Sequence, residues 1–409
     1  MKTLFLLLIC CSVLFASCYN PVFHEIRKEV KLTDATIQSD VNSIVRFTCD
    51  GNEYLVCQNY GKVYYKEADK ERLGNEVVWT PRGNSSFSPV TYSFTSAEYK
   101  GEIITKLAAD DKYLYLLNGR IERNTDGTVN VVEKKIYCTD SLKGDTWTLV
   151  DTKAIDSDFK ISVDSSSGSA SSIFCTNAIP ESGRKAYFRN GKDLYVLNGS
   201  LTPLIQDKKT IKIPDIAVPS GKTFNEVADS CVVKSAVWFN GDVLFFGTIA
   251  STTDETSATS ATKYYYAYGN GINYSSDTVQ YYDETKCTHV ALSNSGAISC
   301  MAVTKDCLLY GFGDFYSTST GSGGIHKVLK NADGSIDGTE KDFSTNASAV
   351  LTSSYQIITL LVADPSKDEL NNYIYASNNF KSTGSSISVS YDNVCLWAYY
   401  PTRGNWNRE

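Results

Sequence analysis

A group of antiparallel strands that recurs along the chain is the feature that most limits its fold. The clearest copy lies at residues 110–150. Two runs of alternating apolar and polar residues, 113–117 and 131–138, are followed there by a short strand after a Gly-Asp-Thr-Trp turn. Period-two alternation with aromatic and β-branched residues, broken by Asn-Gly or Asp-Gly turns, is typical of β-hairpins. The stretch therefore predicts three consecutive strands.

Similar strand starts, each a polar turn followed by an aliphatic and aromatic run, recur along the chain. They begin at Asp50, Asp110, Asn190, Asn240, Lys305 and Leu370. A second pattern joins an aromatic strand through a glycine turn to a strand containing Trp79, Trp147 or Trp406. Repeats of about 60 residues with about four strands bury their faces when they are arranged radially. We therefore predict an all-β fold, a single β-propeller of about six to seven four-stranded blades.

Composition agrees with an all-β chain, because 27 Tyr and 17 Phe accompany only two Met and nine Pro. We expect the propeller to occupy residues 41–409 as one domain. Its last strands, ending at Trp406, are predicted to complete a blade begun near Ile44 and so to close the ring. Loops rich in Ser, Thr and Gly at 164–172, 251–262 and 317–324 interrupt the repeats and are interpreted as solvated spacers.

Residues 1–17 are predicted to be a signal peptide. Lys2 supplies the positive start, and residues 4–15 form an apolar run too short to span a membrane. The segment Leu14-Phe15-Ala16-Ser17-Cys18 resembles the lipobox of bacterial lipoproteins, in the permissive form attributed to spirochaetes. The resemblance implies that Cys18 becomes a lipidated N-terminus and that residues 18–40 form its tether. Several acyl chains such as palmitate anchor stably, at about 0.8 kcal/mol per buried CH₂.

The predicted location is therefore an envelope membrane, most naturally the outer membrane, with the body on its periplasmic or surface face. Expected partners are the bilayer, through acylated Cys18, and an envelope or extracellular protein or glycan. Simple secretion is the alternative, and four sequons at Asn84, Asn198, Asn273 and Asn346 would be glycosylated in a eukaryotic secreted protein. A net charge of −7 without a basic stripe disfavours nucleic acid as a partner.

The cysteines are scattered singly along strand-like runs, where cysteine behaves as a small hydrophobic residue. Nine remain if the leader is removed and Cys18 is lipidated. Cys49 with Cys57, and Cys300 with Cys307, could each pair across neighbouring strands in an oxidising compartment. No Cys-x-x-Cys is present, so zinc-ribbon and thioredoxin-type sites have no support.

No cluster of residues in the sequence indicates a particular reaction. The segment 139–148 is similar to the Asp-box turn of sialidase-like propellers, and a sialidase needs an arginine cluster, a Tyr with a Glu, and an acid. The candidate arginines are Arg46, Arg72, Arg82, Arg120, Arg123, Arg184, Arg189 and Arg403. The only histidines are His24, His289 and His326, which lie far apart. We therefore predict no catalytic residue, no metal site and no cofactor.

The leading interpretation is a membrane-anchored envelope lipoprotein that acts as a non-enzymatic binding or scaffold propeller for proteins or glycans. A sialidase-like, glycan-processing enzyme is the first alternative, and a soluble secreted glycoprotein is the second. Three Arg, a Tyr and a Glu lining the central funnel would support the enzyme. A funnel lined by Ser, Thr and apolar residues would not.

Overall fold

The described part of the chain consists of strands joined by turns and loops. In the computed structural model the described residues are 37, 41–59, 61–73, 76–83, 100–123, 129–153, 155–163, 171–179, 183–191, 193–203, 231–239, 242–249, 263–269, 272–276, 279–282, 287–292, 298–312, 323–332, 336–343, 351, 355–380 and 394–409. Within these residues, no helix is long and apolar enough to cross a membrane.

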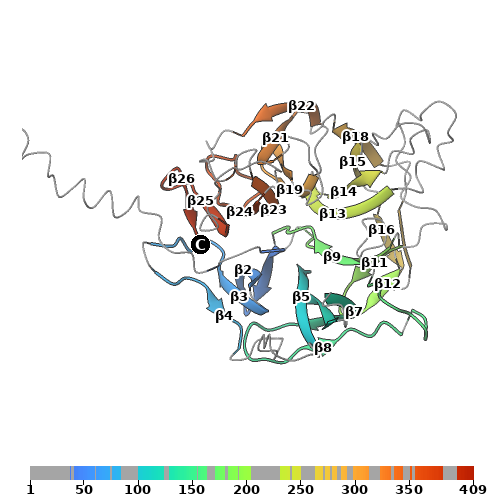
Figure 1. Cartoon of the computed structure of the whole chain (residues 1–409). Coiled ribbons are helices and arrows are strands. Elements are labelled where there is room, and N and C mark those ends of the chain that lie inside the picture. The colour runs from blue at the N-terminus through green and yellow to red at the C-terminus, as the bar shows by residue number, and fades with distance from the viewer. Residues whose placement is uncertain are drawn as a thin grey trace, which may run out of the picture.

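The described strands form six four-stranded antiparallel sheets and one two-stranded sheet. Each four-stranded sheet is one blade, and Figure 1 shows the blades following one another around a ring. The innermost strands are β1 (Ile44–Cys49), β5 (Lys100–Ala109), β9 (Ser172–Cys175), β13 (Cys231–Phe239), β19 (Ile298–Val303) and β23 (Tyr355–Val362). Each inner strand contacts the next, and β23 contacts β1. The prediction of an all-β propeller is therefore confirmed, with six blades.

The other strands of each blade follow outward from the inner one. The second strands are β2 (Asn52–Asn59), β6 (Leu114–Arg123), β10 (Ala186–Asn190), β14 (Asp242–Ile249), β20 (Cys307–Phe312) and β24 (Ile374–Phe380). The third strands are β3 (Lys62–Glu67), β7 (Val129–Thr139), β11 (Asp193–Leu197), β15 (Lys263–Gly269), β21 (Ile325–Lys330) and β25 (Leu396–Tyr400). The outer strands are β4 (Thr80–Pro81), β8 (Thr148–Leu149), β12 (Leu201–Pro203), β18 (Cys287–Leu292), β22 (Ile336–Asp342) and β26 (Asn405–Arg408). A hairpin of β16 (Ile272–Ser276) and β17 (Val279–Tyr282) lies between β15 and β18 in sequence.

The repeated polar turns do join strands, although not always the same pair. Five of the six predicted starts connect the first and second strands of a blade, as at Asp50 and Gly51, where both residues have positive φ. The turn at Asn190 instead connects β10 to β11, the second and third strands of its blade. Sequence similarity between turns thus marked hairpins correctly, but it did not show which two strands of a blade each turn joins.

The ring closes differently from the prediction, because the last strands do not complete the first blade. β1 and β26 belong to different sheets, and each sheet has four strands of its own. In Figure 1 the blue first blade lies beside the red last blade. Ile37 is fully buried there, and its backbone exchanges hydrogen bonds with Glu409 and Leu396. Side-chain contacts and this short segment, rather than a shared sheet, join the two blades.

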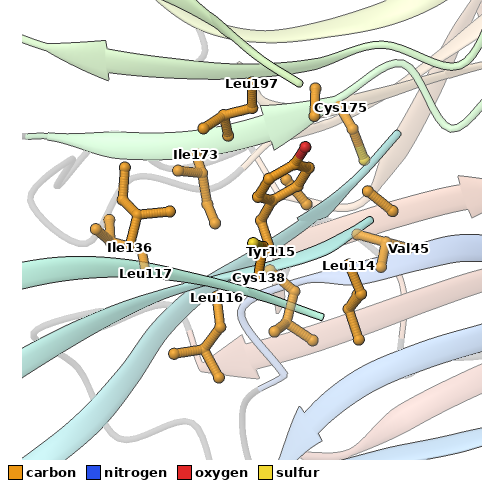
Figure 2. Close-up of a cluster of buried hydrophobic side chains, with 14 of the residues drawn as sticks. Val45, Leu114, Tyr115, Leu116, Leu117, Ile136, Cys138, Ile173, Cys175 and Leu197 are labelled. Carbon is orange, nitrogen blue, oxygen red and sulfur yellow. The ribbon is translucent and has the colours of Figure 1, made fainter. Parts of the chain in front are cut away.

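The buried core lies between the blades. One cluster joins the first three blades, and Figure 2 shows Val45 from β1, Tyr115 and Cys138 from the second blade, and Cys175 from β9 converging there. Four consecutive residues of β6, 114–117, are all fully buried. The central strands of a blade pack against neighbours on both faces, so their burial does not alternate as a half-exposed strand would.

The two disulfide pairings that the sequence left open are absent from the described residues. Cys49 lies opposite Asn52 and Cys57 lies opposite Ile44, so these two thiols are separated along the strands. Cys300 pairs with Gly311 rather than with Cys307. All seven cysteines with described side chains are free and buried. The two cross-strand pairings are therefore wrong, while the interpretation of these cysteines as small core residues is confirmed.

Candidate functional site

The six inner strands surround the propeller axis, which in this architecture is a central channel, and two cavities lie along it. At one end is a cavity of about 80 Å³, which we call the lysine mouth. Its lining comes from every inner strand and from the segment before β1: residues 42–45, 106, 107, 172–175, 177, 234–236, 299–301 and 358–360. Hydroxyl, amide and ammonium groups alternate with apolar side chains around it. Lys106 and Lys234 are the cationic residues in this lining.

β-Bulges bring several of these side chains to the axis. Four inner strands carry one extra residue against their second strand, and these residues are Thr105, Lys234, Ser299 and Ile358. A bulge rotates the following side chains and bends the strand. Three of the four extra residues line the lysine mouth, and Lys106 directly follows the fourth. The same irregularity thus recurs around the ring and concentrates polar groups on the axis.

Lys106 has an unusual environment for a charged side chain. Its Nζ donates a hydrogen bond to the Asn42 carbonyl oxygen at 2.5 Å. Burial lowers the pKa of Lys106, and the Cys300 thiol is the group that acts in the opposite direction. No carboxylate among the described residues forms an ion pair with it. Lys106 is half-buried, and partial desolvation of an ammonium without an anionic partner favours either a neutral amine or an anionic guest.

Hydroxyl and thiol groups surround this amine. Ser43 Oγ accepts from the Leu107 backbone N–H at 2.8 Å, which links the segment before β1 to β5. Ser299 Oγ donates to the Gly311 carbonyl oxygen at 3.0 Å and keeps lone pairs for a further donor. Burial raises the pKa of Cys175 and raises that of Cys300 to about 11, so both thiols are neutral near pH 7.

The opposite end of the channel is smaller and more apolar. This tryptophan mouth has a volume of about 30 Å³ and is lined by residues 176–178, 237, 238, 301–303, 360–362 and 365. Gly183 has φ +90°, and a Cβ built on it would lie 2.8 Å from the Trp238 ring, so only glycine fits there. Asn177 lines both mouths and adopts φ +51°, which is uncommon for a residue with a side chain.

Two of the candidate arginines converge beside the tryptophan mouth. Arg46 Nε lies 3.1 Å and Arg184 Nη2 lies 2.6 Å from the same Glu53 Oε1. Glu53 Oε2 accepts from Thr48 Oγ1 at 2.9 Å, so both carboxylate oxygens already have partners. This cluster ties the first blade to the third. Among the described residues, this cluster most resembles the arginine set of a sialidase. Its two guanidinium groups, however, already pair with Glu53.

The other arginines with described side chains lie away from the lysine mouth. Arg72 bonds to backbone at the junction of the first and last blades, Arg120 pairs with two glutamates, and Arg403 pairs with Glu71. Arg189 is buried in β10, where desolvation lowers its pKa to about 10. The described lining of the lysine mouth therefore has lysines where a sialidase would need three arginines.

The turn that is similar to an Asp box has a structural position at the edge of the second blade. It joins β7 to β8 at residues 139–148, and Arg82 from the first blade packs 4.4 Å from the centre of the Trp147 ring. Arg82 also donates to the Thr146 carbonyl oxygen at 2.9 Å and to the Ser141 carbonyl oxygen at 3.1 Å. The turn thus holds two adjacent blades together.

Several predicted features lie outside the described residues. These include Cys18, His24 and most of the three Ser- and Thr-rich loops. His326 is described, and its Nε2 lies 2.8 Å from the Gly323 carbonyl oxygen while its ring stacks on Tyr310. No group of three His, Cys, Asp or Glu that could hold a metal ion occurs among the residues searched, which are the described ones.

No family model and no curated protein matches the chain. Among solved structures, an exo-1,5-alpha-L-arabinanase from a bovine ruminal metagenomic library aligns with 12% identity and a TM-score of 0.34, over 76% of this chain and 99% of its own. A xylan beta-1,4-xylosidase from Bacillus halodurans C-125 aligns with 11% identity and a TM-score of 0.30, over 84% and 68%. BBS1N, solved in complex with ARL6DN, aligns with 9% identity and a TM-score of 0.33, over 89% and 90%.

These comparisons correct the leading interpretation of the sequence, a non-enzymatic binding or scaffold module. An arabinanase and a xylosidase are among the aligned structures, and these are glycan-processing enzymes rather than binding modules. The alignments describe the fold, and identities of 12% or less do not define a substrate or a reaction. The substrate and the reaction therefore have to be inferred from the side chains that line the channel.

The residues that form this site were missed at the level of sequence. Lys106, Lys234, Ser299 and Trp238 stand in strand-like runs that look like many others in the chain. A bulge adds one residue to an alternating pattern and leaves no composition signal. Only the pairing register reveals that the same position is irregular in four blades.

Proposed function

We propose that this protein is an exported, lipid-anchored β-propeller that processes an acidic glycan at the lysine mouth of its central channel. The carrying observation is Lys106, a half-buried amine on the cavity wall with no carboxylate partner among the described residues. A bound carboxylate would supply the missing charge and a charge-assisted hydrogen bond. A sugar acid is a carboxylate whose remaining hydroxyl groups match the polar lining.

The size of the cavity decides how such a ligand would bind. A volume of about 80 Å³ admits a carboxylate group and a few waters rather than a whole sugar ring. The acid group therefore enters the channel while the ring stays at the opening. Asn42, Ser172 and Thr359 line the same cavity, and their amide and hydroxyl groups can bond to sugar hydroxyls.

The proposed anchor would place the tether at the end of the molecule where the lysine mouth lies. From Ile37, beside Glu409, the chain reaches Val41, whose carbonyl oxygen accepts from Ser377 Oγ at 2.7 Å, and then Asn42 at the lysine mouth. The 20 residues from Cys18 to Ile37 span at most about 70 Å when extended. A lipidated Cys18 would thus keep the body, and the lysine mouth with it, near the bilayer.

Replacing Lys106 with methionine tests the ligand. Binding of uronate-containing oligosaccharides, measured by calorimetry, should weaken about 10- to 100-fold, since a hydrogen bond to a charged group contributes about 1.5–3 kcal/mol. Lys143→Met is the matched control, because Lys143 is 82% exposed and pairs with Asp50 at the surface. Matched neutral oligosaccharides should bind both proteins alike. Equal binding of acidic glycans by the two variants would refute the assignment of the lysine mouth.

Replacing Cys18 with serine tests the anchor. The unaltered protein should partition into membranes and give an N-terminal peptide carrying diacylglycerol on Cys18. The variant should appear in the aqueous phase, because the acyl chains provide nearly all of the membrane affinity. An unmodified N-terminus near this position in the native protein would instead support the soluble secreted glycoprotein.

A further inference from the structure

We infer that Lys106 is the base of a β-elimination reaction, in which the protein cleaves a polyuronate chain at its lysine mouth. This inference rests on the proposed function and adds the type of reaction. The glycosidic oxygen at C4 of a uronate is β to the carboxylate, so loss of the proton at C5 can expel it. The reaction requires a base beside the bound carboxylate and positive charge or hydrogen-bond donors around it.

The geometry of the lysine mouth provides these groups. Lys106 follows the bulge of β5 and lies on the channel wall, where its Nζ reaches the Asn42 carbonyl oxygen at 2.5 Å. Lys234 is the extra residue in the bulge of β13 and brings a second cation to the same lining. A carboxylate bound in this cavity of about 80 Å³ would bring C5, the carbon that bears it, into the same lining as Lys106.

The step balances without a co-reactant. The neutral amine of Lys106 takes the proton from C5, and the electron pair of that C–H bond forms the C4=C5 double bond. The C4–O bond breaks, and its electron pair leaves with the glycosidic oxygen, which is then protonated by the Lys106 ammonium or by water. One chain ends in an unsaturated uronate and the other in a new hydroxyl group, so no oxidant or reductant is used.

The charge state of the amine agrees with this role. Burial lowers the pKa of Lys106 from its ordinary value, which increases the fraction of neutral amine at a given pH. The other titratable groups of the mouth are Lys234, Cys175 and Cys300, and burial keeps both thiols protonated. The remaining lining from β1, β19 and β23 is hydroxyl, amide or apolar. The rate of elimination should therefore rise with pH through the pKa of Lys106.

The Lys106→Arg variant tests the role of Lys106 as a base separately from the role of its positive charge. Arginine keeps a cation at this position and cannot be deprotonated in proteins, so it can bind the carboxylate but cannot take the proton. The full mature protein, Lys106→Arg, Lys106→Met and the surface control Lys143→Met are each incubated with polygalacturonate, alginate and hyaluronan. Ultraviolet absorbance of the C4=C5 product, a reducing-end assay and calorimetric binding are measured on every sample, together with thermal unfolding.

The expected result is unsaturated product with the unaltered protein and with Lys143→Met, and a loss of about 10²- to 10⁴-fold with Lys106→Arg although it still binds the polymer and folds. Reducing ends without the double bond would show hydrolysis, which overturns the inference and leaves the proposed function standing. Unsaturated product at an unchanged rate in Lys106→Arg would assign the base to another residue. Neither binding nor product with any acidic polymer would overturn both.

Discussion

Replacing Lys66 with alanine is expected to lower the free energy of unfolding by about 3–5 kcal/mol, because it leaves a buried carboxylate without its partner. Lys66 Nζ lies 2.5 Å from Glu409 Oε2, and both side chains are fully buried. Trp79 Nε1 donates to the same carboxylate oxygen at 2.8 Å, and the Tyr400 hydroxyl donates to the other one. Glu409 would keep these two bonds and lose the cation of its ion pair.

The position of this pair explains why its loss should affect the whole ring. Lys66 belongs to the first blade and Glu409 follows the last strand of the sixth, so the pair lies at the seam where the ring closes. The ammonium also lies 4.7 Å from the Tyr375 ring centre and 5.2 Å from that of Trp79. Burial lowers the pKa of Lys66, whereas the charge of Glu409 acts against that shift.

Urea unfolding of Lys66→Ala beside Lys70→Ala measures the effect. Lys70 pairs with Glu76 at 3.3 Å, but both side chains are more than 40% exposed, so its loss should change stability by less than about 1 kcal/mol. The double variant Lys66→Met with Glu409→Leu should recover much of the loss, because apolar residues can replace a buried ion pair. A Lys66→Ala protein as stable as Lys70→Ala would contradict the role of this pair in ring closure.

Replacing Glu53 with alanine is the second large effect that we expect, again a loss of about 3–5 kcal/mol. Its carboxylate stands between two buried guanidinium groups, those of Arg46 at 5% and Arg184 at 1% exposure. Burial and the charge of Arg184 lower the pKa of Arg46, whereas the charge of Glu53 raises it. Without it, two like charges would face each other in a partly dry site.

Glu67→Ala is the matched control for this variant, because Glu67 ends the adjacent strand β3 and is exposed. It should change the urea midpoint little. The urea midpoint of Glu53→Gln should fall between those of Glu53→Ala and Glu67→Ala, since the amide oxygen can still accept a hydrogen bond from one arginine while the negative charge is gone. A midpoint for Glu53→Ala equal to that of Glu67→Ala would show that the guanidinium groups are solvated and that the cluster does not hold the first and third blades together.

Turn chemistry made much of this fold predictable. Asp110 accepts backbone hydrogen bonds from Lys112 at 2.7 Å and from Tyr113 at 2.6 Å, so the Asp-Asp-Lys motif forms its hairpin through local contacts. The same reasoning placed Asn190 in a hairpin and failed to tell which two strands it joins. Local bonds fix a turn, whereas the position of that turn within a blade depends on strands far away in the sequence.

The channel could not have been predicted in the same way. Lys106 and Lys234 are 128 positions apart in the sequence, and each becomes part of the channel only because a bulge turns an inner strand at that point. Arg46 and Arg184 converge on Glu53 from the first and third blades, although they are 138 positions apart in the sequence. A sequence pattern shows the period-two alternation of a strand. It does not show how that strand pairs with its neighbour or where a bulge interrupts the pairing.

The sequence by itself determined the class of fold and the approximate number of blades, because period-two runs and polar turns are local properties of neighbouring residues. It also carries the Leu14–Cys18 segment, from which the anchor is proposed. The tertiary structure alone decided how the ring closes, through Lys66 and Glu409, and which side chains meet on the axis. Those outcomes depend on packing between blades, and packing brings together residues that no local pattern relates.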